Sequence, residues 1–103
     1  MLGFSQGAYL GYLLSIKNPK VFDGLIACGG SLVTEAFKDK DYKKAKNLKI
    51  IISHGLQDKV VPYEESQKAF DLLKAKGLKV TLDSFEGAHS INKELLKTWL
   101  GGL

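Results

Sequence analysis

A serine flanked by glycines lies almost at the start of the chain, in the segment Gly3-Phe4-Ser5-Gln6-Gly7. Small residues two positions before and two positions after a serine allow a strand to turn sharply into a helix. Such a turn lifts the hydroxyl out of the backbone and points the helix N-terminus at it. A hydroxyl in this position is suited to nucleophilic attack on a carbonyl carbon. The structural alternative is that Ser5 only caps the helix by accepting backbone N–H groups.

A serine nucleophile needs a base and an acid, and two segments further along the chain offer them. His89 follows an apolar strand predicted at 78–85, and Asp58 follows an apolar strand predicted at 48–53. All three side chains are therefore expected at strand ends. The order serine, acid, histidine is the order of the α/β hydrolases and of neither classical protease group. We predict His89 as the base and Asp58 as the acid that orients it.

Other residues could take the roles of base and acid, but they are less well placed. His54 is the other histidine and directly follows its predicted strand, so it is an alternative base. We prefer His89, because a place after the last strand lets Nε2 reach the serine hydroxyl while Nδ1–H faces the acid. Asp58 could also serve only to brace its loop. Three other aspartates fit the acid position poorly, since they lie in irregular or helical segments: Asp39, Asp41 and Asp71.

These segments resemble the carboxylesterase, lysophospholipase and acyl-protein thioesterase branch of the α/β hydrolases. The resemblance is carried by Gly3-Phe4-Ser5-Gln6-Gly7, by His54-Gly55 followed by Asp58 and Val61-Pro62, and by Gly87 two residues before His89. It implies hydrolysis of a small acyl ester or thioester through an acyl-enzyme on Ser5, with no cofactor and no metal ion. Dienelactone hydrolases usually have cysteine as the nucleophile, and prolyl peptidases typically have tyrosine after the serine. A serine followed by Gln6 therefore disfavours both groups.

The resemblance implies a partial domain. Members of this group have several strands and helices before the serine, so we expect residues 1–103 to form a single domain that corresponds to the C-terminal half of the fold. In the complete fold the oxyanion hole uses the N–H after the nucleophile, here Gln6, and a second N–H that has no counterpart in these residues. Loss of one such donor costs about 10²–10³ in rate. A non-catalytic fragment or assembly module that keeps the triad residues is thus an alternative.

Apolar segments alternate with helical patterns along the chain, which indicates an α/β fold. We predict a mostly parallel sheet of three to four strands with flanking helices. The strands are expected at 1–4, 21–28, 48–53 and 78–85, and the helices at 6–17, from Tyr63 to a C-cap at Gly77, and at 91–100. The segment 29–47 is the least determined, with a short helix expected around 33–37 or 41–46.

The chain is basic but contains no arginine, since fifteen lysines and eleven acidic residues give a formal net charge of +4. Arginine makes bidentate phosphate and guanine contacts that lysine cannot reproduce, so we expect no nucleic-acid site and interpret 38–49 as a solvated surface. The single cysteine, Cys28, allows no intrachain disulfide and fits a buried core position in a cytoplasmic protein. No apolar run has the length of a membrane span, so membrane insertion is not expected.

The helix predicted at 6–17 is apolar nearly all round, which implies burial on several sides. The predicted strands are apolar runs of the kind found in parallel sheets that are covered on both faces. Uncovered helix faces and an exposed parallel edge favour association with another chain. We therefore expect a homo-oligomer or a complex with a complementary N-terminal half.

Overall fold

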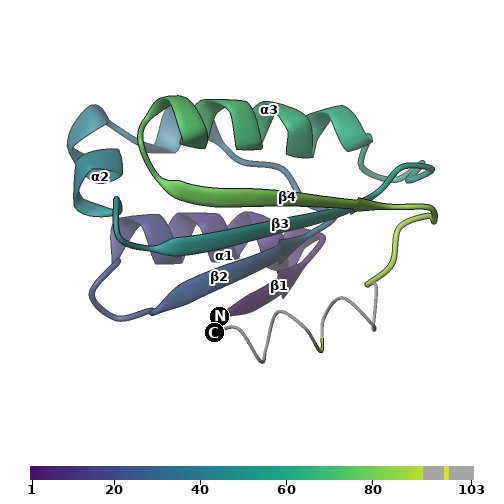
Figure 1. Ribbon diagram of the computed structural model, residues 1–103, viewed down its shortest axis with the longest axis horizontal. Coiled ribbons are helices and arrows are strands. Elements are labelled where there is room, and N and C mark those ends of the chain that lie inside the picture. Colours follow the sequence, from purple (N-terminus) through teal and green to yellow (C-terminus); the bar gives the residue numbers. More distant parts are fainter. Residues whose placement is uncertain (92–96, 98–103) are drawn as a thin grey trace.

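The computed structural model describes residues 1–91 and Lys97, and within them four parallel strands form one sheet (Figure 1). The elements follow in the order β1 (Leu2–Phe4), α1 (Gln6–Lys17), β2 (Gly24–Cys28), the 3-10 helix η1 (Thr34–Ala36), α2 (Asp39–Lys44), β3 (Lys49–Gly55), α3 (Tyr63–Ala75) and β4 (Lys79–Phe85). The strand order β1-β2-β3-β4 is also the chain order. The predicted α/β class with three to four mostly parallel strands is confirmed.

The helices that connect the strands lie on one face of the sheet. Crossovers between parallel strands are right-handed as a rule, and each strand here is added on the same side of the previous one, so every connection crosses the same face. The main hydrophobic core fills the space between this face and the helices. Its buried residues include Ala8, Tyr12 and Ile16 from α1, Ala69 and Leu73 from α3, and Leu25, Ala27, Ile50, Ile52 and Val80 from the strands.

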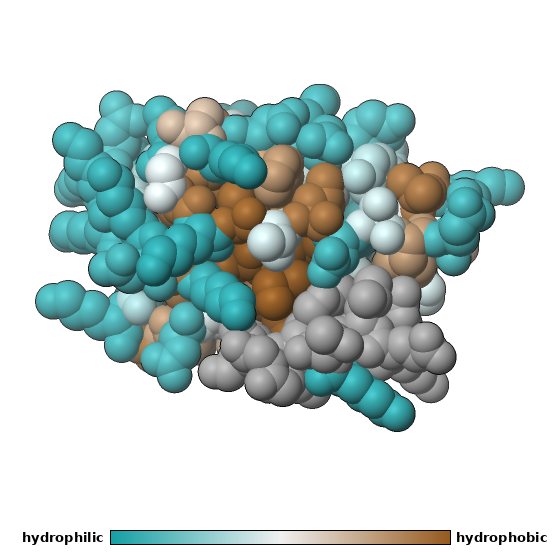
Figure 2. Space-filling view, in the orientation of Figure 1, coloured by the Kyte–Doolittle hydropathy of each residue, from teal (hydrophilic) through white to brown (hydrophobic). Residues whose placement is uncertain are grey.

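The opposite face of the sheet carries a second, smaller apolar cluster. Ile26, Cys28 and Ile51 are buried there, with Phe4 and Ile91 packed against them. Strand β2 is thus buried on both faces along its whole length. Figure 2 shows apolar side chains gathered over the strands and hydrophilic side chains around them. The helix predicted at 91–100 lies largely outside the described residues.

The boundary predicted for the second strand is wrong. The strand was expected over 21–28, but β2 begins only at Gly24. A turn precedes it, in which the Val21 N–H donates to the Asn18 carbonyl oxygen at 3.0 Å. This turn leaves the Val21 side chain 73% exposed, so its apolar character does not report a strand position.

Two other segments differ from their prediction, one in the length of its strand and one in the number of its helices. The strand expected over 48–53 continues to Gly55, because its pairing with β4 runs through His54 and Gly55. In the segment 29–47, where one short helix was expected, both η1 and α2 form. Helix α3 ends at Ala75 with Lys76 as its C-cap, one residue before the C-cap predicted at Gly77. Gly77 follows with a φ of +85°, and the N–H groups of Gly77 and Leu78 donate back into the last turn of the helix.

The turn from β1 into α1 brings two backbone segments into direct contact at Gly3. A Cβ added at Gly3 would lie 2.2 Å from the carbonyl oxygen of Gly7, a distance that real Cβ atoms do not show. At Gly7, apart from its two chain neighbours and the backbone of its own helix, no atom of the described residues lies within 4 Å of an added Cβ. The close approach of strand and helix therefore requires glycine at the first of these positions and not at the second.

We predict that Gly3→Ala destabilises the chain by about 1–3 kcal/mol, because backbone atoms must move to make room for the methyl group. Gly7→Ala is the matched control. It places the same methyl group in the first turn of α1, where alanine is favoured over glycine by about 0.5–1 kcal/mol. Urea unfolding followed by circular dichroism measures both effects. Equal unfolding midpoints for the two variants would contradict the predicted close contact.

Candidate active site

Ser5 lies at the sharp turn between β1 and α1 in a strained backbone conformation. Its φ of +58° is the one positive value among the non-glycine residues described, and such a conformation costs about 1–3 kcal/mol. The Ser5 N–H donates to the Cys28 carbonyl oxygen at 2.8 Å, which ties the turn to β2. The Ser5 side chain makes no capping hydrogen bond to α1. The alternative interpretation of this residue as a helix cap is therefore wrong.

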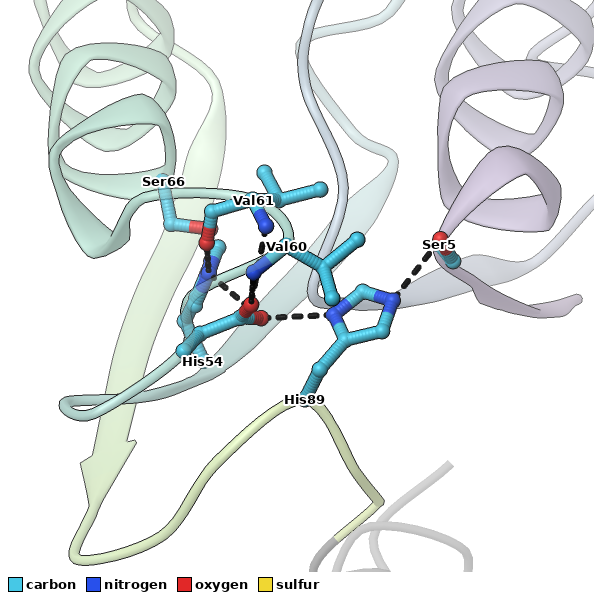
Figure 3. Close-up of polar contacts among 7 residues, drawn as sticks. Ser5, His54, Val60, Val61, Ser66 and His89 are labelled. Carbon is cyan, nitrogen blue, oxygen red and sulfur yellow. Dashed lines mark hydrogen bonds and ion pairs between the residues drawn. The ribbon is translucent and has the colours of Figure 1, made fainter.

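The Ser5 hydroxyl, the His89 imidazole and the Asp58 carboxylate form a continuous hydrogen-bonded chain (Figure 3). Ser5 Oγ lies 2.9 Å from His89 Nε2, and His89 Nδ1 lies 2.6 Å from Asp58 Oδ2. Because the carboxylate requires a proton on Nδ1, Nε2 is left free to accept the serine hydroxyl proton. The structure thus brings together the three side chains predicted from sequence, which come from the ends of β1, β3 and β4. Their catalytic roles stay predictions.

Asp58 is buried, and both of its oxygens accept hydrogen bonds. Oδ1 accepts the backbone N–H groups of Val60 and Val61, each at 2.8 Å. Oδ2 accepts from His89 and lies 3.1 Å from Nε2 of His54. Burial raises the pKa of Asp58, but the hydrogen bonds from His89 and from the two backbone N–H groups outweigh it. The pKa of this carboxyl therefore lies below its usual value, and the group is ionised at neutral pH.

The loop that carries His89 is tied to the loop that carries Asp58. The pairing of β3 with β4 continues beyond the strand ends, because the Leu56 N–H donates to the Phe85 carbonyl oxygen at 2.9 Å. The Gln57 N–H donates to the Gly87 carbonyl oxygen at 2.9 Å, and the Gln57 side-chain oxygen accepts the Gly87 N–H in return. These bonds fix the distance between the two loops and so align the imidazole with the carboxylate.

Two further contacts fix the position of His89. The backbone before it passes so close to Gly55 that a Cβ added there would lie 2.2 Å from the Ala88 carbonyl oxygen. The His89 ring itself packs against the Phe4 ring, with 4.7 Å between the ring centroids. The imidazole is therefore held from the β3 side by backbone contact and from the β1 side by an aromatic ring.

A cavity of about 440 Å³ opens beside Ser5 and is lined by Ser5, Gln6, Tyr9, Ser31 and Val61. The Gln6 N–H lies at the start of α1 and has no acceptor among the described residues. Unpaired N–H groups at a helix N-terminus favour negative charge. A larger cavity of about 570 Å³ lies around the far end of α1, between Lys17 and Val21, and its lining includes no histidine or serine.

His54, the alternative base, contacts Asp58 and makes no hydrogen bond to Ser5. It is fully buried, and its Nδ1 lies 2.5 Å from the hydroxyl of Ser66 on α3. Its Nε2 lies 2.7 Å from the Val61 carbonyl oxygen. Sequence reasoning missed Ser66, because a serine within an amphipathic helix belongs to no motif. The spacing of twelve residues from His54 to Ser66 carries no signal by itself.

The described residues offer no metal site and no reactive thiolate. Within residues 1–91, no group of three or more His, Cys, Asp or Glu side chains is arranged to hold a metal ion. Cys28 is buried, as predicted, and burial raises the pKa of its thiol to about 11. The thiol is therefore protonated at neutral pH. None of the helices described here is long and apolar enough to cross a bilayer.

A parallel α/β sheet with a strained strand-to-helix turn at a serine is the arrangement of the α/β hydrolases. Within that class, the chain belongs to the phospholipase/carboxylesterase family, whose model matches residues 1–100. The family predicted from the sequence motifs is confirmed.

Relatives of known name point to the same family. The chain is similar to a probable carboxylesterase SOBER1-like of Arabidopsis thaliana, with 35% identity over 108 residues, and to the carboxylesterase SOBER1 of that plant, with 32% identity over 103 residues. Each match takes in 95% of this chain, but only 39% and 45% of the two relatives. The chain therefore spans less than half the length of these relatives.

Solved structures share the fold over nearly the whole chain. The crystal structure of Arabidopsis thaliana SOBER1 matches with a TM-score of 0.78 and 30% identity, over 97% of this chain and 49% of that chain. Zea mays acyl-protein thioesterase 2 matches with a TM-score of 0.77 and 21% identity, over 98% of this chain and 54% of that chain. The four strands and their helices thus correspond to about half of these structures.

We predict that Asp58→Asn makes unfolding less sensitive to acid. Because the folded-state pKa of Asp58 is lowered, its stabilising contribution is complete above the unfolded-state pKa of about 3.9 and is lost as the pH falls through the lower folded-state value. The difference in unfolding free energy between wild type and Asp58→Asn should therefore shrink below about pH 4. Urea unfolding at stepped pH measures it. A difference that stays constant down to pH 2 would contradict the lowered pKa.

Proposed function

We propose that this chain is a serine hydrolase that cleaves carboxylic ester or thioester bonds through an acyl-enzyme. The observation that supports this best is the hydrogen-bonded chain from Ser5 Oγ through His89 to Asp58, with distances of 2.9 and 2.6 Å. Membership of the phospholipase/carboxylesterase family and similarity to proteins named carboxylesterases support the same chemistry.

In the acylation step, His89 Nε2 takes the proton of the Ser5 hydroxyl as Oγ attacks the carbonyl carbon of the substrate. Negative charge develops on the carbonyl oxygen, where the Gln6 N–H at the start of α1 would stabilise it. The imidazolium then gives its proton to the leaving oxygen or sulfur, the bond to that atom breaks, and an acyl ester remains on Ser5. Asp58 holds the proton on Nδ1 and stabilises the imidazolium.

In the deacylation step, a water molecule attacks the acyl ester while His89 takes its proton. The bond to Ser5 Oγ breaks, the imidazolium returns a proton to Oγ, and the carboxylic acid leaves. The complete α/β-hydrolase fold adds a second oxyanion N–H from a loop after its third strand. A site with the Gln6 N–H as its one oxyanion donor would turn over about 10²–10³ more slowly than a site with both donors.

The test of this function is the reaction of Ser5. The 103-residue chain should release a burst of p-nitrophenol from p-nitrophenyl acetate and should be labelled by a fluorophosphonate, and Ser5→Ala should abolish both, because the nucleophile is gone. Ser84→Ala is the control, since Ser84 is an exposed serine on β4. Stopped-flow absorbance and mass spectrometry provide the measurements. An undiminished burst in Ser5→Ala would show that the nucleophile lies elsewhere.

A second candidate function, that of an assembly module, is favoured by the surface of α1. Tyr9 is 42%, Leu10 52% and Leu14 44% exposed. Strand β1 lies at the edge of the described sheet and pairs there with β2 alone. Exposed apolar side chains and an unpaired strand edge favour association. We propose that another polypeptide covers this surface, either a second copy of the chain or a complementary half of the hydrolase fold.

We expect the wild-type chain to sediment as a dimer or larger species at micromolar concentration. The double variant Leu10→Lys, Leu14→Lys should sediment as a monomer with unchanged circular dichroism, because charge on the outer face of α1 opposes its burial. Val21→Lys is the matched control, since Val21 is exposed but lies outside α1 and β1. A wild-type chain that is only monomeric would contradict self-association.

A further inference from the structure

Asp58 contacts two imidazoles, and the mechanism above uses only one of them. His54 Nε2 lies 3.1 Å from Asp58 Oδ2, the same oxygen that accepts from His89 Nδ1 at 2.6 Å. The side chains of His54 and Asp58 are both completely buried. In Figure 3 the dashed contacts begin at Ser66 and His54 and end at His89 and Ser5. The proposed catalytic chain therefore extends beyond the acid into the protein interior.

The surroundings of His54 determine which of its nitrogens carries a proton. Nε2 faces two acceptors, the Val61 carbonyl oxygen at 2.7 Å and the Asp58 carboxylate, so Nε2 must be a donor. Nδ1 faces the Ser66 hydroxyl, which can donate a hydrogen bond to it. Ser66 is fully buried on α3 and therefore anchors the imidazole to that helix.

His54 contacts one oxygen of the Asp58 carboxylate directly and is linked to the other through Val61. It contacts Oδ2 directly, and it binds the carbonyl of the Val61 residue whose N–H donates to Oδ1 at 2.8 Å. A rotation of the carboxylate would disturb the contact between His54 and Oδ2 and the hydrogen bond from the Val61 N–H to Oδ1. The Tyr63 ring packs edge-on against the imidazole, with 5.8 Å between centroids and an interplanar angle of 86°, and so restrains the ring plane.

We propose that His54, anchored by Ser66, is a positioning residue that orients the Asp58 carboxylate toward His89. The inference rests on the function proposed above. It differs from a role in core packing alone, because a positioning residue changes the rate of the chemical step and the ionisation of Asp58. Substrate binding should be unaffected, since His54 does not line the cavity beside Ser5.

Three variants separate the hydrogen bond from the volume of the side chain. His54→Leu fills the site without a donor, His54→Gln keeps an N–H donor near the position of Nε2, and Ser66→Ala removes only the anchoring hydroxyl. Ser84→Ala is the control, because Ser84 pairs in register with His54 on the neighbouring strand but is exposed. Thermal unfolding followed by circular dichroism establishes that each variant is folded.

The first readout is hydrolysis of p-nitrophenyl acetate. His54→Leu should lower kcat about 10–100-fold with KM unchanged, because a displaced carboxylate misaligns the base. His54→Gln should restore most of the lost rate, Ser66→Ala should lose about three- to tenfold, and Ser84→Ala should match the wild type. Equal kcat in His54→Leu and His54→Gln would overturn the proposal.

The second readout does not depend on activity. Titration of the Asp58 carboxyl carbon by NMR should show a raised pKa in His54→Leu, because the N–H of His54 that lies 3.1 Å from the carboxylate is gone, and a value near wild type in His54→Gln. An unchanged pKa of Asp58 in His54→Leu would overturn the proposal, whether or not the wild type is active. Inactivity of the wild type would instead refute the proposed hydrolase function. If His54→Leu does not fold, unchanged titration and kcat in Ser66→Ala overturn it.

Discussion

The geometry of the candidate site depends on the burial of one carboxylate. A buried charge is costly unless hydrogen bonds replace the water it has lost. Asp58 obtains them from two backbone N–H groups of its own loop and from His89 after β4, and Nε2 of His54 lies 3.1 Å from the same carboxylate. The loops after β3 and β4 must therefore converge before the charge is satisfied. The same convergence places His89 Nε2 against the Ser5 hydroxyl.

The parallel sheet makes this convergence possible. In a parallel sheet all strands end at the same edge, so the loops after β1, β3 and β4 all start from one edge of the sheet, with only β2 between β1 and β3. Backbone pairing continues from β3 and β4 into the loops through Leu56 and Gln57. At the other side, the Ser5 N–H bonds to the end of β2 and holds the turn in its strained conformation. Local strain at the serine is thus supported by long-range hydrogen bonds.

Sequence patterns predicted the fold class and family, because apolar runs indicate where the buried strands lie and glycine positions indicate where the backbone turns sharply. They failed at Val21, where an apolar residue lies in an exposed turn. They left the role of Ser5 open, since a helix cap and a nucleophile require the same residue in the same place. They missed Ser66, because its contact with His54 depends on how α3 packs against β3. A contact between two elements that are distant in the sequence leaves no motif in either of them.

Two features of the chain remain without a partner among the described residues, and they lie together. The Gln6 N–H, proposed as an oxyanion donor, and the exposed apolar side chains of Tyr9 and Leu10 all belong to the first turns of α1. Tyr9 also lines the cavity beside Ser5. A polypeptide that covers this part of α1 would therefore border the reacting carbonyl and stand where a second N–H donor is needed. If the proposed association and the proposed hydrolase function both hold, turnover is expected to depend on association, because the partner that buries the helix would also complete the oxyanion hole.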